Sequence, residues 1–284
     1  MTPSTRLQTV TFINGRPVES ERACISVLDN ALLYGEGLFE TFLCIDDRLI
    51  FREGHLRRLY RGARVTGMKI PVKRDTLIEW LTRAVRRHPD RVKKLRLTVS
   101  SGESARWAGK QGTPQVIMTV SSHELPEEPF KLHVSSFRID QDSVFRRIKT
   151  ISYGIHAAAL RLARQNHCDD ALMLNETGKV AEATSANIFW VRKGRVYTPP
   201  ISSGCLEGVT REFTCREARR LGIEVTEKNE TLEQMLTADE VFLSSSLKLV
   251  IGVARVDNGP RNYRLTPGPI TRDIRNRFLR LVKI

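Results

Sequence analysis

A polar segment with two prolines lies near the middle of this 284-residue chain and divides it into two parts. The segment is SSHELPEEP, from Ser121 to Pro129. Polar runs that contain proline usually connect folded regions. Predicted strands and helices alternate on both sides of the segment, and the length suits two domains with sizeable cores. We therefore expect an α+β fold with a smaller N-terminal α/β domain over residues 1–120, a linker over 121–130 and a larger C-terminal domain over 131–284.

Hydrophobic periodicity places the individual elements. In the N-terminal part it predicts strands over 9–13, 37–42, 48–51, 94–99 and 115–120, a loop over 29–36, and helices over 53–68 and 75–88. In the C-terminal part it predicts a strand from 131, further strands over 171–174, 180–191, 223–226, 240–243 and 250–256, and helices over 155–165, 209–221, 232–236 and the C-terminal residues.

Composition argues against several classes of function. The 46 Lys and Arg against 32 Asp and Glu give a net charge of +14, but the basic residues are spread along the chain and no nucleic-acid-binding motif accompanies them. We see no apolar run long enough to cross a bilayer and no signal peptide. We expect a cytoplasmic protein without a nucleic-acid or membrane partner.

The cysteines and histidines show no pattern of a disulfide framework or a metal site. The five cysteines are scattered without a CxxC spacing, and the six histidines form no HExxH motif. We therefore predict no bound metal.

Lys149 and Glu182 are the residues whose chemistry stands out. Lys149 lies in a short segment with Ile148, Ile151 and Tyr153, where desolvation can lower the pKa of an amine and make it a nucleophile toward a carbonyl. A carboxylate such as Glu182 can pair with the protonated nitrogen of a bound pyridine and so favour electron withdrawal by the ring. From the residues alone, a solvated basic strand edge remains the simpler interpretation of Lys149.

Four short motifs occur together in one order. They are Lys149, AEATSAN over 181–187, GVTR over 208–211 and FLSSS over 242–246. In this order they resemble the signature of the class IV aminotransferases, the fold-type IV pyridoxal-phosphate enzymes. That family includes branched-chain and D-amino acid aminotransferases and aminodeoxychorismate lyase. The resemblance implies pyridoxal 5'-phosphate in a cleft between two domains, amino acid and 2-oxo acid substrates, and a homodimer.

The resemblance also assigns roles around the cofactor ring. Lys149 would bond covalently to the cofactor's aldehyde carbon and, once displaced, would carry a proton between substrate and cofactor. Glu182 would pair with the ring nitrogen, and Leu206 would lie against the ring face. Tyr153 would either reach the phenolic oxygen or be an ordinary core tyrosine, because branched-chain enzymes place their tyrosine one residue further from the lysine.

Three groups of residues would hold the cofactor phosphate. HLRRL over 55–59 resembles the HxxRL helix motif of the family, which makes Arg58, rather than Arg57, the phosphate arginine. Gly208, Val209 and Thr210 open a predicted helix, whose N–H groups and dipole favour an anion. Ser245 and Ser246 would add further donors.

The substrate is less sharply specified. The loop over 102–106 resembles the Gly-x-x-x-Arg loop of D-amino acid aminotransferases and aminodeoxychorismate lyases, so Arg106 would meet a substrate carboxylate. Phe39 stands where the D-amino acid enzymes have a tyrosine. We expect an aminotransferase, with a D-amino acid somewhat favoured over a branched-chain L-amino acid. A lyase that gives 4-aminobenzoate and pyruvate is nearly as well supported. A non-catalytic anion binder is a third alternative, and the retained Lys149 and Glu182 argue against it.

Overall fold

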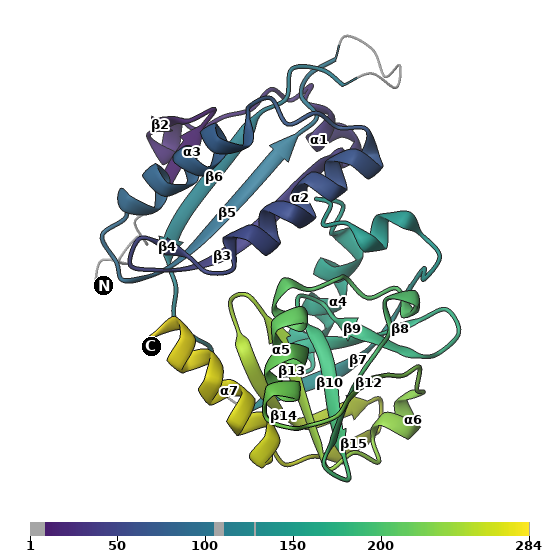
Figure 1. The fold of residues 1–284 in the computed structure, drawn as a ribbon. Coiled ribbons are helices and arrows are strands. Elements are labelled where there is room, and N and C mark those ends of the chain that lie inside the picture. The colour runs from purple at the N-terminus through teal and green to yellow at the C-terminus, as the bar shows by residue number, and fades with distance from the viewer. Residues whose placement is uncertain (1–8, 105–110, 128, 284) are drawn as a thin grey trace, which may run out of the picture. The chain divides into compact units, whose positions relative to one another are not determined.

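The computed structural model of the protein describes residues 9–104, 111–127 and 129–283. The chain forms two compact units, which Figure 1 displays in one ribbon. The N-terminal unit consists of Met1–Glu124 and Ile148–Ser152, and the C-terminal unit consists of Leu125–Arg147 and Tyr153–Ile284. Both units mix helices with a sheet, as the predicted α+β class requires. The segment Ile148–Ser152 belongs to the N-terminal unit although it follows the predicted linker.

The described part of the N-terminal unit contains an antiparallel sheet with the strand order β2-β1-β6-β5-β3-β4. Its elements are β1 (Val10–Ile13), β2 (Arg16–Val18), η1 (Ser20–Arg22), α1 (Asn30–Tyr34), β3 (Gly37–Ile45), β4 (Arg48–Leu49), α2 (Arg52–Thr66), α3 (Arg74–Arg86), β5 (Val92–Ser100) and β6 (Val116–Ser122).

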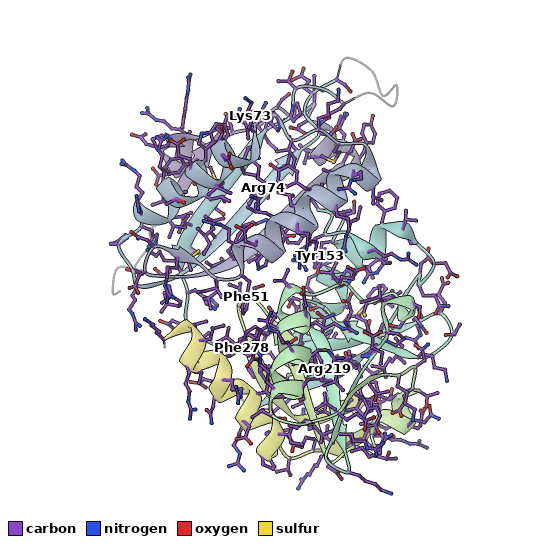
Figure 2. All side chains as sticks on the ribbon, in the orientation of Figure 1. Phe51, Lys73, Arg74, Tyr153, Arg219 and Phe278 are labelled. Carbon is purple, nitrogen blue, oxygen red and sulfur yellow. The ribbon has the colours of Figure 1, made fainter. Side chains whose placement is uncertain are left out.

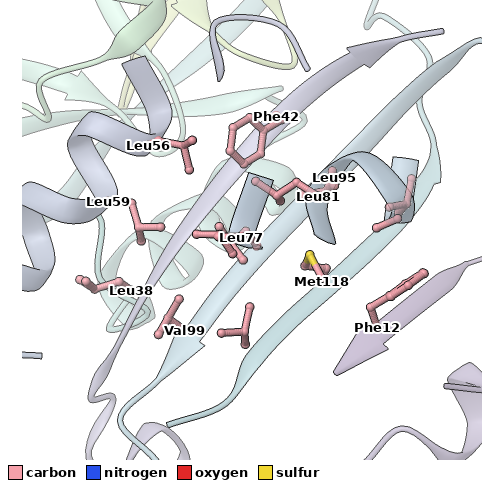
Figure 3. Close-up of a cluster of buried hydrophobic side chains, with 14 of the residues drawn as sticks. Phe12, Leu38, Phe42, Leu56, Leu59, Leu77, Leu81, Leu95, Val99 and Met118 are labelled. Atoms are coloured by element: carbon pink, nitrogen blue, oxygen red, sulfur yellow. The ribbon is translucent and has the colours of Figure 1, made fainter. Parts of the chain in front are cut away.

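Helices α2 and α3 cover one face of this sheet (Figure 1). Because strand side chains alternate between faces, Leu95, Leu97 and Val99 of β5 all point toward the helices and are fully buried. Figure 3 shows the core in which leucines of α2 and α3 meet Phe42, Leu95 and other side chains of the sheet. Glu40 lies in β3 two residues before Phe42, so a carboxylate points into this apolar layer.

The segment Ile148–Ser152 is fixed to the beginning of β3. The N–H of Phe39 donates to the carbonyl of Lys149 at 2.9 Å, and the N–H of Ile151 donates to the carbonyl of Gly37 at 3.0 Å. These bonds use the edge of β3 opposite β5, so the lysine and the strand are held in one register.

The described part of the C-terminal unit contains a mixed sheet with the order β12-β11-β10-β13-β14-β7-β8-β9, and β15 also pairs with β14. Its elements are β7 (Phe130–Ile139), η2 (Val144–Arg147), α4 (Gly154–Gln165), β8 (Asp170–Asn175), β9 (Val180–Ala183), β10 (Asn187–Arg192), β11 (Arg195–Thr198), η3 (Ile201–Ser203), α5 (Val209–Arg220), β12 (Val225–Glu227), α6 (Leu232–Met235), β13 (Glu240–Ser245), β14 (Leu249–Asn258), β15 (Arg261–Arg264) and α7 (Pro269–Val282).

Helices α4, α5 and α7 pack against this sheet. Alanines of α4, among them Ala159 and Ala163, allow the helix to lie close to β7 and β8. Phe278 of α7, labelled in Figure 2, packs edge-on against Phe213 of α5 with the ring centres 4.2 Å apart. Helix α5 thereby has a fixed position on the sheet, with its first turn close to the end of β13.

Several predicted boundaries differ from the structure: the strand expected over 48–51 is Arg48–Leu49, the strand expected over 223–226 is Val225–Glu227, and two segments differ by more. The segment expected to be a loop over 29–36 contains helix α1, because Asp29 accepts the N–H of Ala31 at 2.8 Å and Gly35 ends the helix in the left-handed conformation. The single strand expected over 180–191 is two strands, β9 and β10, separated by a turn. Across the residues that the structure describes, every helix is too short or too polar to span a bilayer.

Candidate active site

The N-terminal unit carries a buried group of three side chains, Glu40, His55 and Arg58, which we call the N-terminal trio. Glu40 faces α2 from β3, and His55 and Arg58 are three residues apart on α2 and therefore share its inner face. Arg58 donates to Glu40 through Nε at 2.8 Å and through Nη2 at 2.6 Å. The Nδ1 of His55 lies 2.7 Å from Oε2 of Glu40.

These contacts keep Glu40 ionised. Burial alone would raise the pKa of the Glu40 carboxyl, but Arg58 and then His55 outweigh it and lower this pKa to about 2. Burial lowers the pKa of His55, so its ring is neutral at pH 7. Because a carboxylate can only accept, Nδ1 of His55 must carry the proton. Arg58, the predicted phosphate arginine, is thus held by a carboxylate that is charged at neutral pH.

Lys149 contacts the opposite face of β3. Phe39 precedes Glu40 and points to the other side of the sheet, where Nζ of Lys149 lies 4.4 Å from the centre of its ring. The guanidinium carbon of Arg96, on β5, lies 3.9 Å from the same centre. The ring of Phe39 therefore makes cation–π contacts with two half-buried side chains, Lys149 and Arg96.

The C-terminal unit carries a second group of the same composition, Glu182, Arg146 and His156, which we call the C-terminal trio. The carboxylate of Glu182 is 6% exposed and lies on β9. Its Oε1 contacts Nη2 of Arg146 and lies 3.6 Å from Nε2 of His156, and its Oε2 accepts the backbone N–H of Leu206 at 2.9 Å. Arg146 also donates through Nε to the carbonyl of Gly204 at 3.1 Å.

The C-terminal trio suits a cationic ring nitrogen. Burial alone would raise the pKa of Glu182, but His156, Arg146 and the N–H of Leu206 outweigh it and lower this pKa below its ordinary range. An ionised, buried carboxylate is the group that stabilises a protonated pyridine. The predicted residue Leu206 is brought to this carboxylate through its backbone.

Tyr153 lies next to the C-terminal trio. It immediately precedes α4, where Figure 2 labels it, and its ring stacks on His156 with the centroids 4.4 Å apart and the planes at 22°. The side chain is half-buried, which distinguishes it from a core tyrosine. A contact of Tyr153 with a phenolic oxygen stays a prediction.

The first turn of α5 and the end of β13 meet in the C-terminal unit. Gly208 is the N-cap residue of α5, and Oγ1 of Thr210 lies 3.5 Å from Oγ of Ser246. A Cβ on Gly208 would lie 1.9 Å from Oδ1 of Asn187, so the close approach of these segments requires glycine. Free N–H groups of a helix start beside two hydroxyls suit a phosphate. Val209 belongs to the same turn, and Ser245 ends β13 with its Oγ accepting the N–H of Lys248 at 3.2 Å.

The structure brings predicted residues together within each unit. In the N-terminal unit Lys149 contacts Phe39, whereas Arg58 contacts Glu40 on the other face of β3. In the C-terminal unit Glu182 contacts Leu206, and Thr210 lies next to Ser246. Arg106 lies outside the described residues.

Sequence reasoning missed Glu40, Arg96, Arg146 and His156. Glu40 had a usable signal, because it occupies an inward position of an apolar strand and therefore needs a buried partner. Arg96 is an arginine on the outward side of a predicted strand, which is an ordinary pattern. Arg146 and His156 had no local signal, since their contact with Glu182 joins distant parts of the chain.

Comparison with known proteins connects this arrangement to a family. The family described as Amino-transferase class IV matches residues 37–256. The branched-chain-amino-acid aminotransferase of Pseudomonas aeruginosa is 30% identical over 286 residues, covering 96% of this chain and 92% of that protein. The aminodeoxychorismate lyase of Bacillus subtilis is 30% identical over 267 residues, covering 92% of this chain and 90% of that protein.

A solved structure extends the similarity to the fold. The branched-chain amino acid aminotransferase from T.th. with pyridoxamine 5'-phosphate has a TM-score of 0.88 and 30% identity, covering 96% of this chain and 93% of that one. These comparisons give no support to the expected preference for a D-amino acid.

Proposed function

The chain belongs to the class IV aminotransferases, whose cofactor is pyridoxal 5'-phosphate, and on that premise we propose that it moves an amino group between an amino acid and a 2-oxo acid. The observation that carries this proposal is the C-terminal trio, which keeps Glu182 buried and ionised. A buried carboxylate that stays charged beside Arg146 can hold a proton on a ring nitrogen.

Two residues supply the reacting groups. The cofactor, when bound, withdraws electrons from the substrate carbon that carries the amino group. Lys149 would hold the cofactor at its aldehyde carbon, and the freed amine of Lys149 would take a proton from the substrate's α-carbon. Phe39 orients that amine through the contact at 4.4 Å. Glu182 holds the proton on the ring nitrogen.

The remaining site residues bind and orient. Arg58, the N–H groups of Gly208 to Thr210, and Ser245 and Ser246 hold the phosphate dianion. Leu206 packs against the ring face, and Tyr153 meets the phenolic oxygen. Every amino acid substrate brings a carboxylate, for which Arg106 and the newly identified Arg96 are the two arginines we propose.

We further propose a branched-chain L-amino acid as the amino donor. The Pseudomonas aeruginosa relative and the solved structure named above are both branched-chain enzymes and support this choice. It replaces the D-amino acid that the sequence alone favoured.

A homodimer is part of the proposal. The segment around α1 exposes Ile25, Val27, Leu28, Leu32, Leu33 and Tyr34, with exposed fractions between 39% and 71%. Exposed apolar residues concentrated in ten positions mark an interaction surface, and we propose a second copy of this chain as the partner. Replacing Leu32 and Leu33 with aspartate should convert the dimer to a monomer in sedimentation, whereas the same change at the isolated Val65 should not.

We propose a cytoplasmic location, which the five free cysteines support.

A second candidate function is that of an aminodeoxychorismate lyase, which the Bacillus subtilis relative favours. Both reactions begin with loss of a proton to Lys149. In a transaminase the amino group would pass to a 2-oxo acid, so the reaction would need that acceptor. In the lyase, pyruvate leaves and no acceptor is needed.

A single-turnover experiment separates these functions. The purified holoenzyme is mixed with L-leucine, with D-alanine or with aminodeoxychorismate, and the cofactor absorbance band is followed. The proposal expects L-leucine to bleach the band and 2-oxoglutarate to restore it. If neither amino acid bleaches the band while aminodeoxychorismate yields pyruvate without an oxo acid, the lyase replaces the transaminase.

A further inference from the structure

The N-terminal trio contains one residue, Glu40, to which the proposed reaction assigns no task. Its carboxylate is fully buried, and it contacts Arg58 twice and His55 once. We propose that Glu40 is a positioning residue for the cofactor phosphate, which holds the guanidinium of Arg58 in one orientation and is itself held by His55. This inference rests on the proposed function, because it takes Arg58 as the phosphate arginine.

The hydrogen bonds define how Arg58 is oriented. A guanidinium is planar, and a carboxylate that accepts from both Nε and Nη2 fixes that plane. The edge that carries Nη1 consequently faces away from Glu40. Ordering an arginine side chain costs conformational entropy, and here that cost falls on folding rather than on cofactor binding.

His55 completes the support of Glu40. Its Nδ1–H donates to the same oxygen, Oε2, that accepts from Nη2 of Arg58, and its ring packs against Phe42 with the centroids 4.5 Å apart. The ring is itself fully buried, so it has little room to turn away. The carboxylate of Glu40 is therefore held in place by its own strand, β3, and by two side chains of helix α2.

The charge of Glu40 makes the direction of the change in cofactor affinity a test of its role. Glu40 is negative, and a negative charge near a phosphate dianion opposes its binding. If Glu40 were only a counter-charge for Arg58, then removing its charge would tighten cofactor binding. If Glu40 positions Arg58, removing its charge should weaken cofactor binding, because the oriented donor is lost.

The Glu40→Gln variant distinguishes a positioning role of Glu40 from that of a simple counter-charge. Glutamine has nearly the same shape, but it offers one acceptor and one donor group where glutamate offers two acceptors. Arg58 has only donors, so at least one of its two bonds to residue 40 must be lost in either amide orientation. The matched control is Glu53→Gln on the same helix, whose carboxylate pairs with Arg74 but is 60% exposed.

The experiment titrates five apoproteins with pyridoxal 5'-phosphate and with phosphate-free pyridoxal: wild type, Glu40→Gln, Arg58→Ala, the double variant of these two, and the control Glu53→Gln. We expect Glu40→Gln to raise the Kd for pyridoxal 5'-phosphate by about 10-fold, the effect of one charge-assisted hydrogen bond. The affinity for pyridoxal should stay unchanged, the double variant should bind no more weakly than Arg58→Ala, and Glu53→Gln should behave as wild type.

Distinct results overturn distinct claims. If Arg58→Ala weakens cofactor binding but Glu40→Gln binds as well as wild type or better, the positioning role is wrong and the proposed function stands. If Glu40→Gln weakens binding further in the Arg58→Ala background, Glu40 does not act through Arg58. If wild type binds neither compound, the proposed function itself fails.

A second variant covers the case in which Glu40→Gln does not fold. His55→Asn keeps the ion pair and removes one support from Glu40. It should weaken the binding of pyridoxal 5'-phosphate in the same direction but less, again without an effect on pyridoxal. An unchanged affinity for pyridoxal 5'-phosphate in a folded His55→Asn protein would overturn the positioning role.

Discussion

The two units contain the same three residue types, a buried glutamate with a histidine and an arginine, in different surroundings. In the N-terminal trio the arginine is 7% exposed and donates twice to a fully buried carboxylate inside a helix–sheet core. In the C-terminal trio the arginine is 20% exposed, shares its donors with the carbonyl of Gly204, and the carboxylate also accepts a backbone N–H.

The comparison shows that two buried trios of the same composition differ in how firmly their surroundings hold them. The N-terminal trio is braced by regular elements, β3 and α2, which suits a group that orients another group. The C-terminal trio draws on Arg146 at the end of the short 3-10 helix η2 and on Leu206 in the connection between η3 and α5, and its histidine stacks on the half-buried Tyr153. Partners on segments between regular elements adjust more easily to a ligand.

The largest expected contrast concerns stability. Glu40→Ala leaves Arg58 buried without its carboxylate and should lower the free energy of unfolding by about 3–5 kcal/mol. Glu182→Ala should cost clearly less, because Arg146 retains the carbonyl of Gly204 and partial access to water. Urea denaturation of both apoproteins measures the difference. Equal losses would mean that the two trios do not differ in this way.

Acid should reveal how much the ionised Glu40 contributes to stability. The pKa of Glu40 is about 2 in the folded state against an ordinary value of 4.5. A lowered pKa gives stability that is complete above about pH 4.5 and is lost as the pH falls toward 2, here about 3 kcal/mol at 1.36 kcal/mol per pKa unit. Glu40→Gln should lack this part of the acid loss. Urea midpoints between pH 7 and pH 3 test it, and parallel curves for variant and wild type would contradict it.

For the reaction rate, in contrast to stability, we expect the larger effect in the C-terminal trio. Glu182→Gln cannot hold a proton on the ring nitrogen as a carboxylate does, so the half-reaction with an amino acid should slow by about 10- to 100-fold. Its urea midpoint should stay close to that of wild type. Stopped-flow absorbance gives the rate, with saturating cofactor so that affinity does not enter. A rate unchanged from wild type would remove Glu182 from the reaction.

The smallest effect concerns the two histidines. His156→Asn removes a ring that lies 3.6 Å from Glu182 and stacks on Tyr153, and it should change the half-reaction rate by at most about 10-fold. His55→Asn should leave that rate unchanged at saturating cofactor. If both substitutions slow the half-reaction equally, the expectation that only the histidine of the C-terminal trio affects the reaction is wrong.

Much of the fold could be predicted because its signals are local. Alternation in β5 and helical spacing in α2 place these elements within a few residues, and Asp29 and Gly35 held a cap signal for α1 that was not used. The strand break between β9 and β10 also had a local signal, because Thr184, Ser185 and Asn187 form a polar cluster that favours a turn.

The site was predictable only where motifs carried it. Lys149 and Glu182 were predicted as site residues because their neighbours resemble a family signature. Arg146 and His156 were not, because their role depends on a carboxylate that is distant in sequence and close in space. Residues that come into contact only in the folded protein show no characteristic spacing in the sequence from which the contact could be predicted.

Reduction of the holoenzyme with borohydride, followed by peptide mass spectrometry, tests the central claim that Lys149 holds the cofactor. We expect a phosphopyridoxyl group on the peptide that contains Lys149, and no reducible attachment in Lys149→Ala. A phosphopyridoxyl group on another lysine of the wild-type protein, or the same amount of reducible attachment in Lys149→Ala, would contradict this claim.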